Sequence, residues 1–410
     1  MPCSPKKARL LLERNKVKVV KKTPFTIQWT VPTRSYTQPI TLGVDSGFTN
    51  IGLSAVTETK ELYSSEVQLR TDIVKLNSER RQYRRTRRNR KTWYRKARFL
   101  NRKKPEGWLA PSIQHKLDSH IKLIERVGKI LPIAKTIIEV AAFDIQKIKN
   151  PDISGTGYQN GVQKDFWNVR EYVLHRDNHT CQNCKGKSKD PVLEVHHIES
   201  RQTGGDLPDN LITLCKTCHN KVSLGRVKLK VKPSKQFRAE TFMSMVRWRL
   251  VNILNSKFSI PNHPFLVSHT YGYITKGKRI EFGLPKSHTN DAFVIAGGDK
   301  RQRTTDTYFI QQVRKCNRKL FKGDRSHIRN TAAREIFGFQ RWDKVLFQGQ
   351  ELFVKGRRVK GAFALSDIEG HLVKETSYKN LTLIEHAGTL LIERRKAIPP
   401  GNELPGPLAD

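Results

Sequence analysis

The sequence predicts a mixed α/β protein of several domains, and three observations support this prediction. The chain has 410 residues, which is more than one ordinary hydrophobic core accommodates. Short apolar strand patterns alternate along it with stretches of helix-forming residues. A compact segment that contains cysteine and histidine interrupts this alternation near the middle of the chain.

The charge of the chain is its most informative bulk property. Lys and Arg number 77 against 37 Asp and Glu, which gives a formal net charge of +40. So positive a surface predicts a polyanionic partner, and nucleic acid is the common one. No stretch is long and apolar enough to span a bilayer, and the N-terminus lacks the apolar core and cleavage site of a secretory signal. The sequence therefore favours an intracellular protein that binds nucleic acid.

The N-terminal quarter predicts a small cap followed by an antiparallel sheet. Residues 1–38 are basic and contain a helix-like stretch, KKARLLLERNK, and then two strand-like stretches, KVKVVKK and PFTIQWTV. Residues 40–69 show an apolar strand, a turn that contains glycine, and two further strands. This second pattern is typical of antiparallel hairpins.

Residues 72–104 predict one long helix, because they contain neither Gly nor Pro and are rich in helix formers. Basic residues cover every face of this helix, so it is not simply amphipathic. Arginine binds phosphate through a bidentate fork, and the interleaved aromatic residues could stack on unpaired bases or pack on the core. The predicted nucleic-acid contacts of this helix are Arg80, Arg81, Arg84, Arg85, Arg87, Arg88, Arg90, Arg95 and Arg98.

The segments that follow predict further α/β structure. Residues 117–130 have helical spacing of apolar residues, and AKTIIEVAAFD at 134–144 fits a buried strand. Gly and Asn then accumulate at 150–161, which indicates a linker. Beyond the Cys/His segment, we expect a helix over 239–258 and a β-hairpin over 267–284.

The C-terminal part begins with a predicted helix in KSHTNDAFVIAGG and then changes character. From about residue 307 the chain shows short strands separated by Gly turns, as in KVLFQGQELFVKGRRVKGAFAL. This pattern is typical of a small β-barrel.

Two C-x-x-C pairs predict a zinc site. Cys181 and Cys184 form one pair, and Cys215 and Cys218 form the other. In a reducing compartment, paired cysteines at this spacing favour zinc over disulfides. Four thiolates suit a tetrahedral, structural Zn²⁺.

Histidines between and beside the cysteine pairs predict a second role for this segment. In LEVHHI the adjacent His196 and His197 point to opposite faces of a strand. Asn210 and His219 follow at spacings that suit the helix of a β-hairpin–helix unit. Such a unit can hold one divalent ion while an imidazole deprotonates water; the alternative is that these histidines are only neighbours of the zinc site.

The segment resembles the zinc-bearing HNH nuclease family over about fifty residues, in CQNC, LEVHHI, GGDLPDNLITLC and CKTCH. This resemblance implies that His197 is the general base and that His196 and His219 bind a Mg²⁺ ion. It also implies that Asn210 orients the base and its loop.

Three acidic segments predict a second metal site. Asp45 lies on the first apolar strand, beside a glycine turn, Glu139 lies within an apolar strand, and His288 and Asp291 are three residues apart on one helix face. A buried carboxylate is costly unless it is paired, and carboxylates that converge on two Mg²⁺ ions would explain these positions. Asp144, the nearest rival of Glu139, would face the other side of a continuous strand and is interpreted as structural.

Together these segments resemble the split RuvC, or ribonuclease-H-like, nuclease. The resemblance implies that Asp45, Glu139 and Asp291 bind metal and that His288 assists in activating water. An isolated Asp in a turn such as Asp45 is, by itself, usually structural.

The order of segments resembles the type II RNA-guided CRISPR effector nuclease, but the chain is too short to contain its large helical lobe. It more closely resembles the compact, transposon-encoded IscB family, whose PLMP cap Pro2-Cys3-Ser4-Pro5 matches imperfectly. The implied fold is a split RuvC domain with an inserted ββα-metal HNH domain, an arginine-rich bridge helix and a β-rich barrel-like tail. The implied domains are the cap 1–38, RuvC-I 39–70, the bridge helix 71–105, RuvC-II 106–160, HNH 161–226, RuvC-III 227–305 and the tail 306–410.

The IscB resemblance also implies partners and a reaction. A noncoding omega RNA would bind the bridge helix and cap, and guide pairing would select double-stranded DNA. HNH would cut the guide-paired strand and RuvC the displaced strand. The tail would read a short adjacent motif, with Trp342, Lys355, Arg357 and Arg358 as candidate DNA contacts. We expect a monomer within a ribonucleoprotein in the prokaryotic cytoplasm, associated with the nucleoid.

Two other functions compete with this interpretation. An unguided HNH homing-type endonuclease would explain the Cys/His segment and the charge, but not Glu139, Asp291 and the arginine helix. A non-enzymatic RNA-binding scaffold would explain the charge, but it is disfavoured because every expected catalytic residue type is present.

Overall fold

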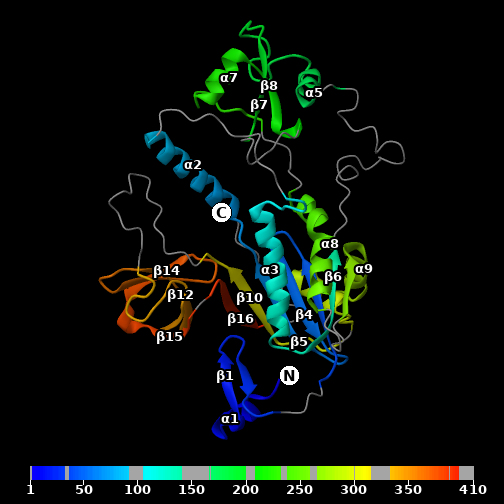
Figure 1. Ribbon diagram of the computed structural model, residues 1–410, viewed down its shortest axis with the longest axis vertical. Helices are drawn as coiled ribbons and strands as arrows, with labels where there is room; N and C mark the ends of the chain where they lie inside the picture. Colours follow the sequence, from blue (N-terminus) through cyan, green and yellow to red (C-terminus); the bar gives the residue numbers. More distant parts are fainter. Residues whose placement is uncertain are drawn as a thin grey trace. The chain divides into compact units, whose positions relative to one another are not determined.

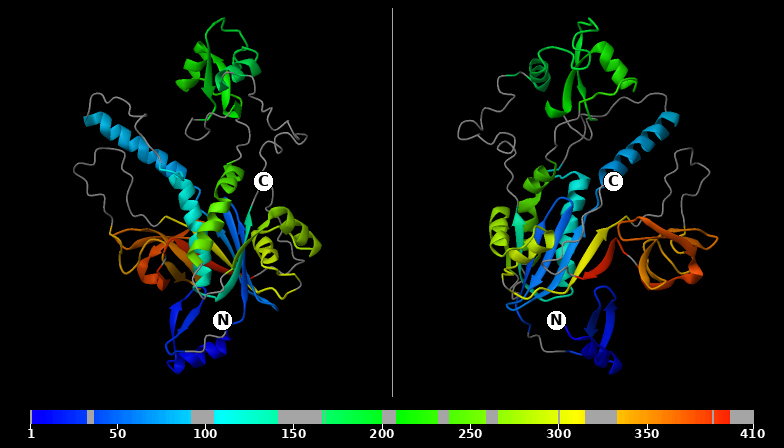
Figure 2. Two further views of the ribbon diagram at one scale, coloured as in Figure 1. Left: turned by 45° about the vertical axis from the view of Figure 1, so that its right-hand side comes forward. Right: turned by 180° about the vertical axis from the view of Figure 1, so that it is seen from behind.

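The computed structural model of the chain (Figure 1 and Figure 2) separates into two compact units. One unit combines Met1–Ala142 with Phe242–Asp410, and the other is Phe143–Thr241. No helix among the described residues has both the length and the apolar character needed to cross a bilayer. The structure describes residues 2–32, 37–91, 105–140, 166, 168–199, 208–231, 238–258, 266–299, 301–314, 333–386 and 388–396.

A seven-stranded mixed sheet organises the first unit, and strands from distant parts of the sequence form it. The strand order is β16-β10-β5-β4-β3-β6-β9. β3, β4 and β5 form an antiparallel meander, which confirms the hairpin pattern predicted for residues 40–69. β6 continues the sheet parallel to β3, and β9 lies parallel to β6. The strands are β3 (Ile40–Ser46), β4 (Asn50–Val56), β5 (Glu61–Gln68), β6 (Ile133–Val140), β9 (Leu266–Tyr271), β10 (Asp306–Gln312) and β16 (Leu390–Lys396).

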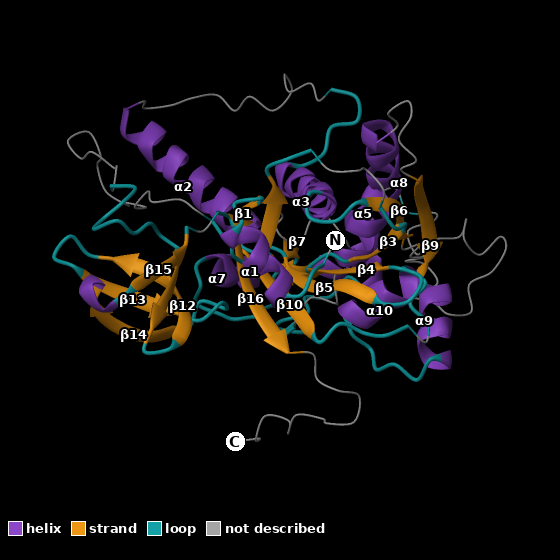
Figure 3. Cartoon of the chain, turned by 90° about the horizontal axis from the view of Figure 1, so that it is seen from below, coloured by secondary structure: helices purple, strands orange, loops and turns teal. Residues whose placement is uncertain are grey.

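Helices cover both faces of this sheet (Figure 3). α3 (Pro111–Gly128) and α8 (Arg238–Phe258) lie on one face, and α9 (Gly272–Glu281) and α10 (His288–Ile295) lie on the other. The helices predicted at 117–130, at 239–258 and in KSHTNDAFVIAGG are therefore confirmed. The predicted linker at 150–161 lies outside the described residues.

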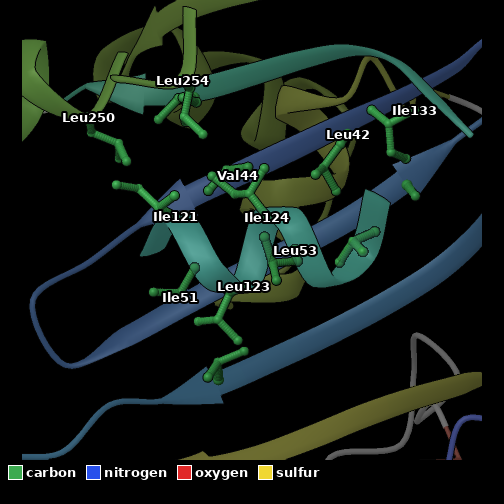
Figure 4. Close-up of a cluster of buried hydrophobic side chains, with 14 of the residues drawn as sticks. Leu42, Val44, Ile51, Leu53, Ile121, Leu123, Ile124, Ile133, Leu250 and Leu254 are labelled. Atoms are coloured by element: carbon green, nitrogen blue, oxygen red, sulfur yellow. The ribbon is translucent and has the colours of Figure 1, made fainter. Parts of the chain in front are cut away.

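The hydrophobic core lies between the sheet and the pair α3 and α8. Leu42 and Val44 of β3 point toward Ile121 of α3 and Leu254 of α8 (Figure 4). The alternate residues of β3 face α10 instead, and a Cβ atom added to Gly43 would lie 2.1 Å from the Ala292 carbonyl oxygen. This close approach places the second turn of α10 directly over the middle of β3.

The β-hairpin predicted over residues 267–284 is wrong. β9 ends at Tyr271, and the chain continues as helix α9, in which Gly277 lies inside the helix rather than at a turn. The helix buries Thr275 and places Arg279 one turn further along the same face, where it pairs with Asp291. These long-range contacts outweigh the local strand pattern, because residues of a short segment have only weak intrinsic preferences.

The cap and the arginine helix match the described part of their predictions. The cap contains α1 (Pro5–Glu13), whose N-cap residue Ser4 accepts a hydrogen bond from Lys7 N, and the antiparallel pair β1 (Val17–Lys21) and β2 (Thr26–Trp29). The predicted long helix is α2 (Ile73–Lys91), and its remainder, 92–104, lies outside the described residues.

The tail contains a five-stranded antiparallel sheet in the order β14-β13-β12-β11-β15. Its strands are β11 (Lys344–Phe347), β12 (Gln350–Arg357), β13 (Ala362–Ser366), β14 (Leu372–Ser377) and β15 (Thr382–Glu385), with the short helix η3 (Tyr378–Asn380) before β15. Within the described part of the tail, β14 and β15 do not pair to close a barrel. The first and last described strands of the predicted tail, β10 and β16, belong to the seven-stranded sheet.

The second unit is small and consists of a hairpin flanked by helices. β7 (Leu193–His197) and β8 (Leu211–Cys215) form an antiparallel pair. α5 (Val169–Arg176) precedes the hairpin, η2 (Pro208–Asn210) leads into β8, and α7 (Lys216–Ser223) follows it.

Candidate active site and metal centre

The four predicted zinc ligands come together in the second unit. The sulfur atoms of Cys181, Cys184, Cys215 and Cys218 all lie within 4.8 Å of one another. The Cys184 and Cys215 sulfurs are 3.8 Å apart, which equals the edge of about 3.8 Å for a tetrahedron with Zn–S bonds of about 2.3 Å. Three of the cysteines are buried and all four are free thiols. This cluster could therefore bind a zinc ion.

Two of the predicted metal-binding histidines meet on one face of the hairpin. The His196 ring on β7 lies 4.9 Å from the His219 ring on α7, measured between centroids. His197, the next residue of β7, faces the opposite side of the strand. Burial, and then the neighbouring His219 and His197, lower the pKa of His196. The lower pKa favours the neutral imidazole, which is the form that binds a metal ion.

Glu194, which was not predicted from the sequence, completes this face. It lies two residues before His196 on β7, so it has the same orientation, and its Oε2 is 2.7 Å from His219 Nδ1. A carboxylate on the far ring nitrogen fixes the tautomer and raises the basicity of a metal-binding histidine. Its i−2 spacing from His196 on a predicted strand was the signal that could have found it. We call His196, His197, Asn210 and His219 the histidine centre.

Asn210 lies in the η2 turn before β8, and not on the helix as predicted. Its side chain is buried. It accepts a hydrogen bond from Glu199 N at 2.8 Å and donates one to Glu199 O at 3.0 Å. The amide thus ties the segment that follows His197 to the start of β8. This contact is consistent with a role in orienting the loop.

The predicted acidic residues gather at one end of the seven-stranded sheet, and we call Asp45, Glu139, His288 and Asp291 the carboxylate centre. Asp45, only 8% exposed on β3, lies with Oδ2 2.6 Å from His288 Nδ1. Asp291 lies on α10 three residues after His288. The ligand atoms of the three carboxylates do not all come within 4.8 Å of one another. Oxygen donors of this kind suit Mg²⁺ rather than zinc.

The electrostatics of the carboxylate centre show that its acids share one region. Burial raises the pKa of Glu139 to about 7, the charges of Asp45 and Asp291 add to this increase, and the Thr275 side chain opposes it. Burial and the charge of Asp45 also raise the pKa of Asp291. Negative charge is therefore costly here, and a bound cation would relieve it.

Helix α9 contributes two residues that were not predicted from the sequence. Arg279 Nε lies 2.8 Å from Asp291 Oδ1, and Arg279 Nη1 donates to the Leu284 carbonyl at 3.1 Å. Thr275, four residues earlier, faces Glu139. One helix thus contacts two of the three carboxylates. The i, i+4 spacing of Thr275 and Arg279 becomes a signal only once the segment is known to be helical.

The turn between β3 and β4 connects the carboxylate centre to its surroundings. Ser46 Oγ donates to the Glu139 carbonyl at 2.5 Å, and Asn50 Nδ2 lies 3.3 Å from His288 Nε2. From α3, the Lys116 ammonium donates to the Phe48 carbonyl and lies 3.5 Å from the Phe48 ring centroid. A Cβ atom added to Gly47 would lie 2.3 Å from the Asn50 carbonyl oxygen, so this tight turn requires glycine. The turn therefore fixes the positions of Glu139 and His288 relative to Asp45.

The arginine helix presents exposed guanidinium groups at its described positions. Arg80, Arg81, Arg84, Arg85 and Arg88 are exposed on α2. The backbones of Arg87 and Arg90 also lie on α2, whereas Arg95 and Arg98 lie outside the described residues.

The predicted DNA contacts of the tail need correction. Trp342 is 7% exposed and packs against Phe353, Ile368 and Leu391, and its Nε1 donates to the Arg314 carbonyl. Its ring belongs to the interior, which removes it from the candidate DNA contacts. The Arg357 guanidinium donates to backbone carbonyl groups within the tail and so stabilises the fold.

The other two predicted contacts of the tail are exposed. Lys355 is exposed, although its Nζ donates to the Gly370 carbonyl at 2.7 Å. Arg358 is exposed and forms an ion pair with Glu375 at 2.9 Å.

Comparisons with known protein families match two parts of the chain. Residues 1–161 match the family described as RRXRR protein, and residues 181–223 match the family described as HNH endonuclease. The second match contains all four cysteines and the histidine centre.

Two curated relatives are similar to part of this chain. The probable HNH endonuclease of Lactococcus phage SK1 is 40% identical over 74 residues, which are 16% of this chain and 74% of the phage protein. The type IV methyl-directed restriction enzyme EcoKMcrA of Escherichia coli (strain K12) is 36% identical over 62 residues, which are 13% of this chain and 22% of that enzyme. The chain thus matches about a fifth of the length of the restriction enzyme.

Solved structures of Streptococcus thermophilus Cas9 are also similar to this chain. The complex with the AGAA PAM has a TM-score of 0.34 and 14% identity, over 51% of this chain and 29% of that one. The complex with the GGAA PAM has a TM-score of 0.35 and 14% identity, over 52% and 30% of the two chains.

Proposed function

Because the chain belongs to the HNH endonuclease family and carries an RRXRR region beside the HNH module, as an IscB-like RuvC/HNH nuclease does, we propose that it is an RNA-guided, metal-dependent DNA endonuclease. It hydrolyses phosphodiester bonds with two centres, one for each strand of a double-stranded target. The observation that carries this proposal is the pair of centres itself. A histidine centre and a carboxylate centre occur on separate compact units of one strongly basic chain.

The histidine centre cuts the guide-paired strand. His196 and His219 hold a divalent ion, which when bound stabilises the phosphate and the leaving oxygen. His197, on the opposite face of β7, takes the proton from the attacking water. Asn210 holds the loop after His197, and Glu194 holds the ring of His219 through Nδ1. The four cysteines bind a structural zinc ion that joins the hairpin to its flanking segments.

The carboxylate centre cuts the displaced strand. The order β5-β4-β3-β6-β9, with three antiparallel strands continued by two parallel strands, supports a ribonuclease-H-like domain. Asp45, Glu139 and Asp291 hold Mg²⁺ ions, which when bound neutralise charge in an in-line displacement. His288, held by Asp45 through Nδ1, assists in activating water.

The arginine helix and the cap bind the guide RNA. The exposed arginines between Arg80 and Arg88 of α2 suit a phosphate backbone. Base pairing to the guide then selects the target, and the tail reads a short adjacent motif. Lys355 and Arg358 remain the candidate tail residues for this contact.

A strand-resolved plasmid cleavage assay tests the proposal. The protein is coexpressed with the noncoding DNA that flanks its gene, and the target plasmid carries a guide match beside a randomised region. We expect cutting of both strands that requires the RNA, the match and Mg²⁺. Cutting without RNA or match would instead support an unguided HNH homing-type endonuclease.

A further inference from the structure

Four aromatic rings form a continuous row along β9, the last strand in the described order of the seven-stranded sheet, and we call Trp248, His269, Tyr271 and Tyr273 the aromatic row. Trp248 lies on α8, His269 and Tyr271 lie on the edge strand β9, and Tyr273 lies in the first turn of α9. Successive ring centroids are 5.0, 5.6 and 6.0 Å apart. The first two contacts are edge-to-face and the last is stacked, so each ring touches the next.

The two ends of the aromatic row are open to solvent. The Tyr273 side chain is 74% exposed and Trp248 is 42% exposed, whereas Tyr271 is partly buried and packs against the core. His269 in the middle is also exposed. Because aromatic rings contribute much of their binding energy by losing contact with water, a contiguous exposed row indicates a surface that a partner covers.

Positive charge around the row identifies the chemistry of that partner. The guanidinium of Arg247 lies 5.9 Å from the Trp248 ring centroid. Lys276 and Lys278 are exposed on α9, within five residues of Tyr273. Exposed rings beside cationic side chains are the combination that binds single-stranded nucleic acid, because bases stack on the rings while cations neutralise phosphates.

The row ends beside the carboxylate centre. Thr270 pairs with Glu139 in the parallel register of β9 and β6, and Tyr271 pairs with Val140. A Cβ atom added to Gly272 would lie 3.0 Å from Glu139 Oε1. Glycine therefore lets the backbone between Tyr271 and Tyr273 approach the proposed metal ligand closely. A DNA strand whose base stacks on Tyr273 would therefore lie close to the proposed reaction centre.

We propose that the aromatic row is a stacking platform that holds the displaced DNA strand next to the carboxylate centre. This proposal rests on the proposed function, because it assigns an unpaired DNA strand to the carboxylate centre. It differs from the predicted RNA surface on α2, which consists of arginines. Stacked bases on Tyr273 and Trp248 give affinity without sequence preference, as cutting at a guide-defined position requires.

Photocrosslinking of the complete ribonucleoprotein tests the platform. The His197→Ala, Asp45→Ala double variant, which cannot cut, is assembled with guide RNA and a target that carries 5-iododeoxyuridine in its displaced strand. After irradiation, crosslinked peptides are mapped by mass spectrometry. We expect crosslinks at Tyr273 or Trp248. Crosslinks from the displaced strand only at other sites, or crosslinks of guide RNA to these two rings, would overturn the proposal.

Cleavage kinetics give a second, independent measure. Tyr273→Ala should slow cutting of the displaced strand about 5- to 100-fold, the range expected for the loss of one stacked base, and should leave the guide-paired strand unaffected. Tyr273→Phe should retain the wild-type rate and Tyr273→Leu should not, because stacking requires a ring. The matched control is Ile280→Ala, since Ile280 is a 61% exposed apolar residue of the same helix α9 that carries no aromatic ring. Equal rates for Tyr273→Ala and wild type would refute the platform.

An experiment with a free oligonucleotide distinguishes failure of the stacking platform from failure of the proposed guided function. The full chain is irradiated with an unpaired 5-iododeoxyuridine oligonucleotide, which requires neither a guide nor cutting. Crosslinks at the aromatic row in a protein that shows no guided cleavage would support the platform and refute guidance. Normal guided cleavage with no crosslink at the row, in this assay or in the ribonucleoprotein, would refute the platform and leave the guided function standing.

Discussion

Lys116→Met should uncouple stability from activity, because Lys116 is a buried cation that holds a functional turn. Its side chain is 6% exposed, and no carboxylate among the described residues forms an ion pair with it. Instead the ammonium donates to the Phe48 carbonyl and lies over the Phe48 ring. The turn that it holds carries Ser46 and Asn50, which contact Glu139 and His288.

Burial of Lys116 costs more than its contacts return. Its pKa falls from 10.5 to about 8, because the ammonium loses contact with water. A net shift of this size, discounted for solvent screening, corresponds to about 1 to 3 kcal/mol at neutral pH. We therefore expect Lys116→Met to leave the free energy of unfolding unchanged or to raise it, by no more than about 3 kcal/mol. The rate of displaced-strand cutting should nevertheless fall about 10- to 100-fold, because a shift of about 1 Å in a catalytic group has this effect.

Two measurements check this prediction. Strand-resolved cleavage should show a slower displaced strand and an unchanged guide-paired strand, and Lys116→Gln, which retains a donor without charge, should recover part of the rate. Calorimetry should show a pH-dependent difference in stability. Since the folded pKa lies below the unfolded value, the unfolded chain binds more protons between about pH 8 and 10.5. Wild type therefore gains stability over this window relative to Lys116→Met. Unchanged displaced-strand cutting, or equal losses on both strands, would refute the reasoning.

Three further predictions address the two centres and the zinc cluster. Arg279→Gln should slow displaced-strand cutting about 10- to 100-fold, because Asp291 loses its ion pair. The same change should weaken Mn²⁺ binding measured by electron paramagnetic resonance, and tighter Mn²⁺ binding would contradict this expectation. Arg279→Lys should retain part of the activity. Glu194→Gln should slow only the guide-paired strand by a similar factor, because His219 loses its carboxylate partner; an effect confined to the displaced strand would contradict the assignment. Cys215→Ser should remove about one zinc ion per chain by elemental analysis and abolish cooperative unfolding of residues 168–231; unchanged zinc content would rule out the cluster.

The parts of the fold that the sequence predicted depend on local patterns. The meander β3–β4–β5 and the helices α3 and α8 follow from apolar periodicity, which short windows contain in full. The zinc cluster follows from two C-x-x-C pairs, because that spacing by itself places two sulfurs on one metal. The grouping of His196 with His219 also agrees with the prediction, since strand alternation decides which histidine of the pair faces α7.

The parts that the sequence did not predict depend on contacts between distant segments. Lys116 is 68 residues from the carbonyl group that it holds, and nothing in its neighbourhood on α3 distinguishes it from a solvated lysine. Helix α9 was predicted as a hairpin because its role lies in contacts to Glu139 and Asp291 on other elements. Arg279 could only have been found after this helix was placed against them.

Two tryptophans show that the exposure of a side chain cannot be predicted from its neighbours in the sequence. Arg341-Trp342 and Arg247-Trp248 have the same local pattern, and in both an arginine guanidinium lies near the ring, at 5.0 Å and 5.9 Å from the centroid. Trp342 was predicted to contact DNA, yet β12 and β16 supply Phe353 and Leu391 to cover it, and it is 7% exposed. Trp248 was not singled out, yet it lies beside the edge strand β9, where no further strand of the described chain covers it, and it is 42% exposed. The same Arg-Trp pattern thus contributes to a core at Trp342 and to a candidate nucleic-acid surface at Trp248. The order of strands in the sheet decides which aromatic rings remain available to a partner.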